Sequence, residues 1–430
     1  MKNPRDATPV ETAGARNFVL FRNNFLPASE TFIHDELRFH RRYSGVVFCR
    51  RRLNENRFPN HKLVCLSDGF LGRADPLQAL YLTTGLHPRF IEAIRRLDPA
   101  LVHAHFGHNG IYALPTAKAA RKPLVVSLHG RDVTMLIGPD RYHPRWLYYT
   151  RTAPILFQQA DLFLAASTEL AELAQEAGCP AHKIRIHRLG VDLDRFRPQG
   201  DHAHPASPTS PGDPGGKPGP RLPRPLRALE HAGPVVCMVG RFVEKKGFEY
   251  GIRAFAKTLE ALPRKGNGRR RPRPMLVIIG SGPRRPLYEQ LVSDLDLGDR
   301  VLFPGPLSQD GVAACMARSA LVMTPSVVAS NLDRESGLIV AKEAAATGLP
   351  VVGTWHGGIP EIVAQGETGF LVPERNVEGL AEALTRLLTD DDLRRRMGVA
   401  ARKKMEREYD IRQSNEELER IYDEVAPERN

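Results

Sequence analysis

Two carboxylates, Glu335 and Glu343, lie eight residues apart in a segment that follows the short apolar run Leu321–Thr324. They open a helix-like run, Leu338–Thr347, with Gly337 expected in its first turn. With about 1.5 Å of rise per residue, a helix would place the two carboxylates roughly 12 Å apart. A nucleotide sugar has about that span, so one carboxylate could hold sugar hydroxyls and the other ribose hydroxyls. A pyrophosphate would then lie near the helix N-terminus, where free N–H groups favour anions.

The spacing by itself is not distinctive. It recurs in polar, helix-like segments, where a solvated helix face is the better interpretation, at Glu374/Glu382, Glu408/Glu416 and Glu416/Glu424. Only Glu335 and Glu343 follow a predicted strand and precede Thr347–Val352, which is typical of a helix end and a new strand. This context, rather than the spacing, makes Glu335 and Glu343 the candidate ligand-binding carboxylates.

Two cations follow another predicted strand, Val235–Val239. Gly240 ends that strand, and Arg241 and Lys246 come next, five residues apart and ahead of the following helix. A planar guanidinium and a mobile ammonium at the carboxyl end of a strand suit a diphosphate. The alternative interpretation is a basic turn on a basic protein.

Two glycine-rich turns lie in the same half of the chain. Ile279–Pro283 follows a strand, and its Gly282 could line a nucleotide. Trp355–Glu361 contains paired glycines, which would let the backbone approach a ligand closely. A lone glycine-rich turn is a weak indication of function, so neither segment identifies a ligand by itself.

The bulk composition limits the class of protein. The 430 residues are enough for two ordinary domains, and 42% apolar residues support full cores. The formal net charge of +12 suits anionic partners, namely nucleotide phosphates, an acidic membrane surface or nucleic acid. The five cysteines lie far apart without metal-site spacing, which favours reduced core residues in a cytoplasmic protein.

Nothing in the sequence predicts a membrane span. The segment Met1–Arg16 is polar and lacks the apolar core of a signal peptide, and no apolar run approaches the roughly 18 residues of a spanning helix. We therefore expect any membrane contact to be peripheral. The basic runs His40–Arg42 and Arg50–Arg52 flank a predicted strand and are the candidates for that contact.

Short apolar, β-branched runs alternate with helix-like segments, which predicts βαβ units and parallel sheets covered on both faces. The predicted strands are Phe18–Phe21, Val46–Cys49, Leu101–His105, Leu124–His129, Asp161–Ala165, Ile184–His187, Val235–Val239, Met275–Ile279, Val301–Phe303, Leu321–Thr324, Val351–Gly353 and Phe370–Val372.

The alternation breaks between Pro198 and Pro234, where ten prolines and six glycines fall within 37 residues. Such a segment cannot bury enough surface to offset its ordering entropy. We therefore predict a first domain at 1–197, a linker at 198–233 and a second domain at 234–405. The tail, 406–430, carries apolar residues at helical spacing and should form a final amphipathic helix, with Leu418, Ile421, Tyr422 and Val425 on its apolar face.

Seven short motifs between about residues 234 and 385 together resemble the retaining glycosyltransferases of family 4. In chain order they are Gly240-Arg241 with Glu244–Gly247, Gly280–Pro283, Pro325-Ser326, Glu335 with Glu343, Gly348–Val352, Gly357–Glu361 and Gly366–Val372. The first half agrees, because His129–Asp132 resembles the acceptor-side His-Gly motif and Leu189–Pro198 resembles the exit from the first domain. Phe25–Ile33 and His103–Gly107 resemble a subgroup that builds bacterial exopolysaccharides of the colanic-acid type.

The resemblance implies the GT-B architecture, an α/β fold of two Rossmann-like parallel-sheet domains facing a cleft, with the last helix crossing back to the first domain. It also implies roles: Arg241 and Lys246 neutralise the leaving diphosphate, and Glu343 holds the ribose. Glu335 contacts the transferred sugar, and His129 lies beside it. The expected catalytic residues are His129, Glu335, Arg241 and Lys246. The expected substrate-binding residues are Glu343, Ser336, Gly337, Leu338, Gly130, Gly240, Gly282 and Ser326.

No metal site is predicted. Asp390–Asp392 resembles one only by charge and suits a helix N-cap. His103 and His105 point to the same face of a strand, but no third ligand accompanies them in the sequence. The cations Arg241 and Lys246, with helix amides, would supply the positive charge that a divalent ion brings, so we expect no cofactor and no metal.

The resulting expectation is a retaining hexosyltransferase that uses a nucleotide diphosphate sugar, UDP-linked as in most relatives. Its acceptor would be a polysaccharide or lipid-linked oligosaccharide in exopolysaccharide biosynthesis, at the inner face of the cell membrane. One alternative is another sugar-nucleotide enzyme, such as an epimerase or phosphorylase. The other is a basic membrane- or RNA-binding protein without enzymatic activity. Nucleic acid is not expected as a partner, because aromatic residues are only 7% and none interleaves with the basic runs.

Overall fold

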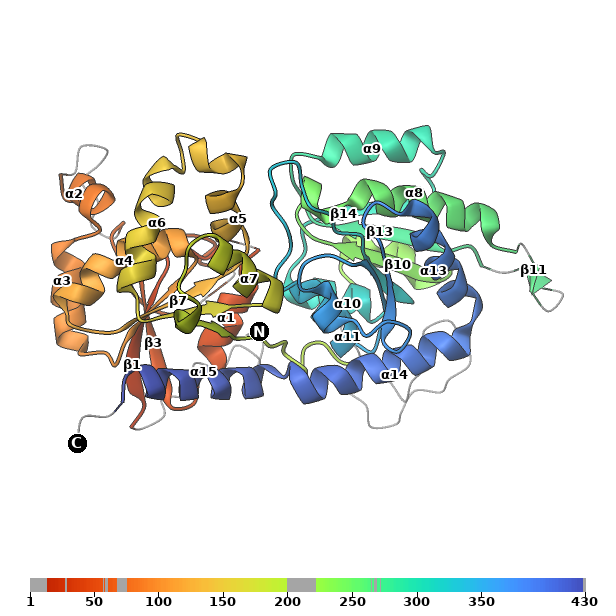
Figure 1. Ribbon diagram of the computed structural model, residues 1–430. Coiled ribbons are helices and arrows are strands. Elements are labelled where there is room, and N and C mark those ends of the chain that lie inside the picture. Colours follow the sequence, from red (N-terminus) through yellow and green to blue (C-terminus); the bar gives the residue numbers. More distant parts are fainter. Residues whose placement is uncertain are drawn as a thin grey trace. The chain divides into compact units, whose positions relative to one another are not determined.

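The computed structural model describes residues 14–27, 29–56, 58, 61–67, 76–198, 222–263, 265–266, 269–270 and 272–427. The chain forms two units, one made of Met1–Gly190 with Ile411–Asn430 and the other of Val191–Asp410 (Figure 1). Each unit is built on one parallel sheet, as the alternating apolar runs predict. None of the described helices is long and apolar enough to cross a membrane.

The sheet of the first unit has seven parallel strands in the order β5-β3-β1-β6-β7-β8-β9. Their bounds are β1 Arg16–Phe21, β3 Tyr43–Cys49, β5 Lys62–Cys65, β6 Val102–His105, β7 Leu124–Leu128, β8 Leu162–Ala165 and β9 Ile184–Ile186. The short strands β2 Asn24–Phe25 and β4 Arg51–Arg52 form a separate parallel pair. The strand order reverses between β1 and β6, and sheets of this kind bind ligands at such a switch point.

Helices connect the strands of the first unit. Their bounds are α1 Thr31–Phe39, α2 Pro76–Thr84, α3 Pro88–Leu97, α4 Gly107–Ala119, α5 Arg131–Ile137, α6 Leu147–Gln159 and α7 Thr168–Glu176, with 3₁₀ turns η1 Pro139–Tyr142 and η2 Ala181–Lys183. The last helix of the chain, α15 Ile411–Val425, also belongs to this unit.

The sheet of the second unit has six parallel strands in the order β14-β13-β10-β15-β16-β17. Their bounds are β10 Val235–Val239, β13 Met275–Ile279, β14 Val301–Gly305, β15 Leu321–Thr324, β16 Val351–Thr354 and β17 Gly369–Val372. A small antiparallel hairpin, β11 Lys265–Gly266 with β12 Arg269–Arg270, precedes β13. Here the strand order reverses between β10 and β15.

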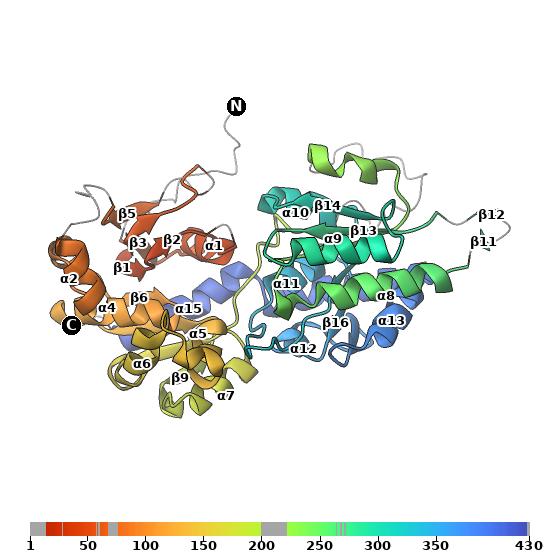
Figure 2. The same cartoon turned by 90° about the horizontal axis from the view of Figure 1, so that it is seen from above.

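Helices cover both faces of this second sheet. Their bounds are η3 Arg224–His231, η4 Glu244–Lys246, α8 Phe248–Ala261, α9 Arg285–Asp294, α10 Gln309–Met316, α11 Ile339–Ala346, α12 Ile359–Ile362, α13 Val377–Thr389 and α14 Asp391–Glu408. One cluster of buried residues joins α8, α9 and α13 to the sheet, and α8 lies beside α13 (Figure 2). The opposite cluster includes residues of α10, α11, α12 and α14.

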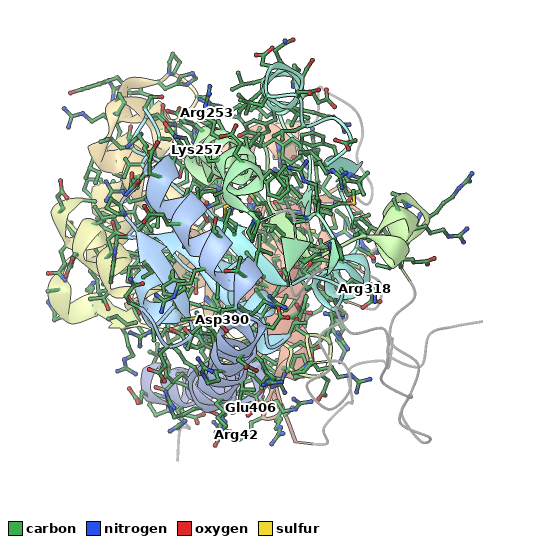
Figure 3. The ribbon with its side chains drawn as sticks, turned by 90° about the vertical axis from the view of Figure 1, so that its right-hand side faces the viewer. Arg42, Arg253, Lys257, Arg318, Asp390 and Glu406 are labelled. Carbon is green, nitrogen blue, oxygen red and sulfur yellow. The ribbon has the colours of Figure 1, made fainter. Side chains whose placement is uncertain are left out.

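The acidic run that precedes α14 acts as a helix start. Asp390, labelled in Figure 3, is the N-cap residue, and its Oδ1 accepts a hydrogen bond of 2.8 Å from the backbone N–H of Leu393. Asp391 and Asp392 follow in the first turn, where negative charge is favourable. The prediction that this run caps a helix is confirmed.

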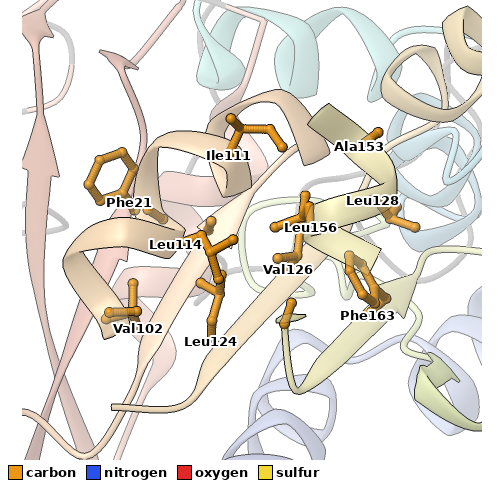
Figure 4. Packing of buried hydrophobic residues seen from close by; sticks show 14 of the residues in the cluster. Phe21, Val102, Ile111, Leu114, Leu124, Val126, Leu128, Ala153, Leu156 and Phe163 are labelled. Atoms are coloured by element: carbon orange, nitrogen blue, oxygen red, sulfur yellow. The ribbon is translucent and has the colours of Figure 1, made fainter. Parts of the chain in front are cut away.

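The core of the first unit shows why its strands have apolar residues on both faces. In β1, Val19 and Phe21 join one buried cluster, whereas the alternate residues Phe18 and Leu20 join the cluster on the other face. Figure 4 shows the first of these clusters, in which side chains of α4 and α6 pack over β6, β7 and β8. Buried apolar area is the main favourable term in folding such a sheet, at about 25 cal/mol per Å².

The cluster on the other face of this sheet includes the last helix. Leu418, Ile421 and Tyr422 of α15 are fully buried there, in the cluster that contains Phe18 of β1. The predicted amphipathic helix is therefore confirmed, and it completes the core of the first unit.

The units divide after Gly190 and after Asp410, whereas the sequence predicts boundaries at 197 and 405. The reason is that Val191 forms a bridge with Asp410, and Leu193 and Phe196 bury their side chains in the core of the second unit. Much of the predicted linker 198–233, namely residues 199–221, lies outside the described residues. The remainder includes η3, whose Leu226 and Leu229 are buried in the second core.

Candidate functional site

Most of the sequence-predicted site residues of the second unit follow the carboxyl ends of its strands. Gly240, Arg241 and Lys246 follow β10, and Gly282 follows β13. Ser326, Glu335, Ser336, Gly337 and Leu338 lie in the long segment between β15 and α11, and Glu343 lies within α11. Because β10 and β15 flank the point where the strand order reverses, these residues surround the usual ligand position of such a sheet.

The structure brings Lys246 and Glu335 together as an ion pair. Lys246 Nζ lies 3.1 Å from Glu335 Oε1, and Glu335 is 8% exposed. Gly240 makes room for the lysine, because a Cβ atom at this position would lie 2.8 Å from Lys246 Cε. A side chain at position 240 would therefore displace the lysine stem from its present path.

The two members of the pair affect each other's protonation. Burial lowers the pKa of Lys246, and Glu335 opposes this effect. Burial would raise the pKa of Glu335, but Lys246 and Lys245 outweigh it and lower the pKa of Glu335 to about 2. Glu335 is therefore ionised at neutral pH and can only accept hydrogen bonds, for example from hydroxyl groups.

Glu335 lies in a loop, which corrects the prediction that it opens a helix. Helix α11 begins at Ile339, so Ser336 and Gly337 precede the helix and the helical rise does not set the distance from Glu335 to Glu343. Serine and glycine are poor helix formers. In addition, the backbone N–H of Glu335 donates to His356 Nε2 over 2.9 Å instead of entering a helical turn.

His356 and Glu374 hold this loop in place. Because His356 Nε2 accepts the Glu335 N–H, its Nδ1 carries the proton and donates to Glu374 Oε1 over 2.7 Å. Glu374 Oε2 in turn accepts from the backbone N–H of Val328 over 2.9 Å. The ends of β16 and β17 are thereby tied to the loop that follows β15.

Sequence reasoning missed this support. His356 was singled out only through the neighbouring glycines, and the prediction that Glu374 lies on a solvated helix face is wrong. The available signal is position, because Glu374 follows directly on β17, at the same edge of the sheet as Gly240.

Lys245 is a second residue that sequence reasoning missed. Its side chain is buried, and Nζ lies 3.1 Å from Asp333 Oδ1 and 3.0 Å from the carbonyl oxygen of Arg334. Its own carbonyl accepts from Val327 N–H over 2.9 Å. Lys245 therefore fixes both ends of the loop segment that precedes Glu335. It is adjacent in sequence to Lys246, the cation that pairs with Glu335.

The remaining predicted residues of this unit differ in exposure. Arg241 is exposed, and its guanidinium has no hydrogen-bond or ion-pair partner within the described ranges, so it is available to an anion. Ser326 is buried, and its carbonyl accepts from Thr354 Oγ1 over 2.5 Å. Gly282 packs against the backbone of Phe242, where a Cβ atom would lie 2.6 Å from the carbonyl oxygen. Glu343 is 8% exposed on α11.

In the first unit, His129 lies where β7 ends, and Gly130 is the N-cap of α5. Asp132 fixes this turn, because its Oδ1 accepts from His129 N–H over 3.0 Å and its Oδ2 from Gly107 N–H over 2.8 Å. The ring of His129 packs against Phe32 and Phe106, with centroid distances of 4.8 and 4.4 Å. Its Nε2 lies 3.0 Å from Nδ1 of His105, the last residue of β6.

The structure supplies a third group beside His103 and His105 that the sequence does not predict. Glu36 of α1 offers an oxygen that lies, with one nitrogen of each histidine, within 4.8 Å of the others. All four ring nitrogens already have hydrogen-bonding partners: His103 has Tyr422 and Ser127, and His105 has His129 and Glu36. The ring nitrogens of this cluster are therefore all engaged by the protein's own groups, whereas Glu36 Oε2 has no hydrogen-bond partner among the described residues.

The histidines of this network are neutral. Burial lowers the pKa of His105 to about 3. Burial, followed by the nearby His105, Arg22 and His108, also lowers the pKa of His129 well below its usual range. Each ring therefore has one N–H donor and one acceptor nitrogen at neutral pH.

A separate basic groove of about 400 Å³ lies on α14 and the segment after α12. It is lined by Ala364, Glu367, Arg396, Val399, Ala400, Lys403, Lys404 and Arg407. The groove contains none of the site residues Arg241, Lys246 and Glu335. It is therefore a second cationic surface, and variants in it can serve as controls for variants in the candidate site.

Two family descriptions match the chain. "Glycosyl transferases group 1" covers residues 227–404, and "Glycosyltransferase Family 4" covers residues 36–195. The Escherichia coli (strain K12) protein WcaL, assigned to colanic acid biosynthesis as a glycosyltransferase, is 30% identical over 73% of this chain and 68% of its own length. The amylovoran biosynthesis glycosyltransferase AmsK of Erwinia amylovora is 30% identical over 74% of this chain and 69% of its own length.

Solved structures share the fold. Anabaena HepE, crystallised with UDP, has a TM-score of 0.70 and 19% identity, covering 95% of this chain and 100% of HepE. Sucrose-phosphate synthase from Thermosynechococcus elongatus has a TM-score of 0.71 and 20% identity, covering 95% of this chain and 99% of its own. At this identity the likeness concerns the fold, and it agrees with two Rossmann-like parallel-sheet units.

Proposed function

We propose that this chain, which belongs to the glycosyltransferases of family 4, transfers a hexose from a nucleotide diphosphate sugar with retention of its anomeric configuration. The observation that carries the proposal is the Lys246–Glu335 pair, which lies in the segments that follow β10 and β15, together with the exposed Arg241 five residues before Lys246. It combines a cationic site for a diphosphate with an ionised acceptor for sugar hydroxyls.

In this proposal the donor diphosphate binds Arg241 and Lys246. A guanidinium binds phosphate oxygens through two parallel N–H groups, and an ammonium adds a mobile charge. The Lys246 side chain is 15% exposed, so its contact with a phosphate is screened less than one on an open surface. The crystal structures of HepE with UDP and with UDP-glucose support UDP as the nucleotide.

The proposed reaction breaks the bond between the anomeric carbon and the leaving phosphate oxygen, and it forms a bond to the acceptor oxygen on the same face. The departing phosphate oxygen takes the acceptor proton, so no separate protein base is required. Arg241 and Lys246 stabilise the charge that develops on the leaving group. Glu335 accepts hydrogen bonds from sugar hydroxyls, Glu343 holds the ribose and the neutral His129 lies beside the sugar.

We further propose a glycan or lipid-linked oligosaccharide as acceptor, in exopolysaccharide biosynthesis. WcaL and AmsK, which match about three quarters of this chain, are assigned to colanic acid and amylovoran biosynthesis. A lipid-linked acceptor would require the protein to work at a membrane surface, where the exposed Arg41 and Arg51 would contact anionic lipid.

Thermal-shift screening against UDP, GDP, ADP and RNA tests the class and the base together. We expect one nucleotide diphosphate to raise the melting temperature selectively. Glu335→Ala and Glu343→Ala should then lose most transfer activity, whereas Glu416→Ala, which alters an exposed carboxylate of α15, should stay near wild type. Equal loss in Glu416→Ala, or release of free hexose in place of a glycoside, would contradict the proposal.

A further inference from the structure

We propose that Glu36 and His105 are positioning residues that fix the tautomer of His129. The expected effect on transfer rests on the proposed function of His129. The tautomer itself does not depend on that function. Nothing in the motifs of the sequence connects Glu36 with His129, because they lie on different elements of the first unit.

The three side chains form an unbroken chain of hydrogen bonds. Glu36 Oε1 of α1 lies 3.1 Å from His105 Nε2, and His105 Nδ1 lies 3.0 Å from His129 Nε2. The two imidazole rings are stacked with an interplanar angle of 10° and a centroid distance of 5.2 Å. Glu36 is 3% exposed and His105 fully buried, so water does not compete for these bonds.

The donor and acceptor roles along this chain follow from its carboxylate end. An ionised carboxylate only accepts, so His105 Nε2 must carry the hydrogen that Glu36 receives. His105 is neutral, and its Nδ1 is then an acceptor. His129 Nε2 must therefore carry a hydrogen as well, which makes Nδ1 the acceptor nitrogen of the neutral His129 ring.

The opposite arrangement would need a proton on Glu36. With that proton on Oε1, every bond of the chain would reverse and His129 would have its hydrogen on Nδ1. The other oxygen, Glu36 Oε2, is buried and has no hydrogen-bond partner in the part of the chain that the structure describes. A proton on Oε2 would leave Oε1 an acceptor, so both the carboxylate and this protonated form give donation from His129 toward Glu36.

A fixed tautomer has a consequence for binding. With Nδ1 as the acceptor, any ligand group that meets it must be a donor, such as a sugar or acceptor hydroxyl. Phe32 and Phe106 hold the ring plane through contacts at 4.8 and 4.4 Å, and the hydrogen-bond chain decides which nitrogen bears the hydrogen. An aromatic ring without nitrogen at position 105 could pack against His129 equally well, but it could not fix the tautomer of His129.

Nitrogen NMR of the full-length protein labelled with ¹⁵N-histidine tests the inference without any substrate. His129 is assigned by comparison with His129→Asn, which serves only for assignment. We expect the wild-type ring to show a protonated Nε2 and an unprotonated Nδ1. A ring protonated on Nδ1, or on both nitrogens at neutral pH, would overturn the inference.

Variants then test whether the chain fixes that state. His105→Phe keeps a stacked ring but removes both nitrogens, and we expect His129 to show exchange between tautomers. Transfer should lose roughly tenfold to a hundredfold in kcat, the scale of a misplaced catalytic group, with the donor KM within twofold of wild type. His105→Asn, whose side-chain oxygen can still accept from His129 Nε2, should recover part of the loss.

His103→Phe is the matched control, because His103 lies on the same strand and is equally buried, and its hydrogen bonds go to Tyr422 and Ser127, with Glu36 Oε1 farther away at 3.8 Å. It should leave the His129 nitrogen signals unchanged. If His105→Phe also leaves them unchanged, the hydrogen-bond chain does not set the tautomer. An inactive wild-type protein with the expected signals would count against the proposed transfer reaction and leave the positioning role intact.

Discussion

Lys246 and Glu335 form an ion pair across two loops, with 3.1 Å between Nζ and Oε1 and with both side chains at least five-sixths shielded from solvent. The pair joins the loop after β10 to the loop after β15. Removing one member of a buried pair leaves an uncompensated charge, which costs about 3–5 kcal/mol in measured cases. The pair therefore has both a structural and a proposed functional role, and variants can separate the two.

Replacing Arg241 or Lys246 by alanine should abolish most turnover. Binding of UDP should weaken far more than binding of uridine, because each charge-assisted contact to phosphate contributes roughly 1.5–3 kcal/mol. Titration calorimetry with both ligands measures the difference. Only Lys246→Ala should also lower the melting temperature, because the guanidinium of Arg241 has no partner within the described ranges.

Two exposed cations serve as controls for this prediction. Arg253 lies on α8 and is labelled in Figure 3, and Lys403 lies in the basic groove on α14. Neither alanine variant should change UDP binding. If Lys403→Ala weakened UDP binding as much as Lys246→Ala, the diphosphate would have to bind in the basic groove.

Acid should reduce the stabilising contribution of Glu335. Its pKa of about 2 lies below the ordinary value of about 4.3, so the unfolded chain takes up the proton more readily than the folded chain. The contribution, on the order of 2–3 kcal/mol, is present above about pH 4.3 and is lost as the pH falls toward 2. The melting temperatures of wild type and Glu335→Gln should therefore converge as the pH falls from about 4.3 toward 2; a constant difference would refute the low pKa of Glu335.

Loss of the His356–Glu374 contact should loosen the loop that carries Glu335. Glu374→Ala leaves the donors of His356 and Val328 without their acceptor, at a cost of about 1–3 kcal/mol for each unpaired buried group. Hydrogen–deuterium exchange should speed up between residues 327 and 338, and turnover should fall. Glu382→Ala, on the exposed face of α13, is the control, and indistinguishable behaviour of the two variants would disprove the role of Glu374.

Transfer should keep the anomeric configuration of the donor and should proceed in EDTA. Arg241 and Lys246 would supply the positive charge at the leaving phosphate, so no dissociable metal is required. Product NMR reports the new linkage directly. An inverted product, or activity that EDTA abolishes and Mg²⁺ restores, would rule out the proposed mechanism.

Binding to anionic vesicles should be weak and salt-dependent. Arg42 is engaged by Asp423 and Glu419, and Arg52 by Glu55. The exposed Arg41 and Arg51 remain, each contributing about 1 kcal/mol at an anionic surface. Flotation at low and high salt, with Arg41→Glu/Arg51→Glu as the charge-reversed control, measures the effect. Absence of flotation at low salt would contradict the proposal that the protein binds an anionic membrane surface.

The sequence predicts β10, β13 and β15 with the same bounds that the structure gives them. Strands buried on both faces of a parallel sheet are continuous apolar runs, which is a strong signal. The edge strand β5 was not predicted, because Lys62 is exposed and only Cys65 of its four residues is fully buried. Edge strands need fewer apolar residues, so their pattern is weaker.

The site was harder to predict than the fold, because its support is made of contacts between distant segments. Glu36 reaches His105 from α1, and Glu374 reaches His356 from the end of β17. In the sequence, Glu36 and Glu374 cannot be told apart from ordinary surface carboxylates. The motifs locate Lys246 and Glu335, but the conformation around Glu335 depends on an acceptor, His356, that only the folded sheet brings to it.

The position of α15 has a consequence for how the protein is made. The cluster around Phe18 and Leu20 is completed by Leu418 and Tyr422, and the intervening second unit spans 220 residues, from 191 to 410. A ribosome adds about 5–20 residues per second, and α15 begins 390 residues after the end of β1, so it is synthesised on the order of twenty to eighty seconds after that strand. During that interval the nascent first unit exposes one apolar face of its sheet, which is the period when a chaperone would act and when a truncated message would yield an aggregating product.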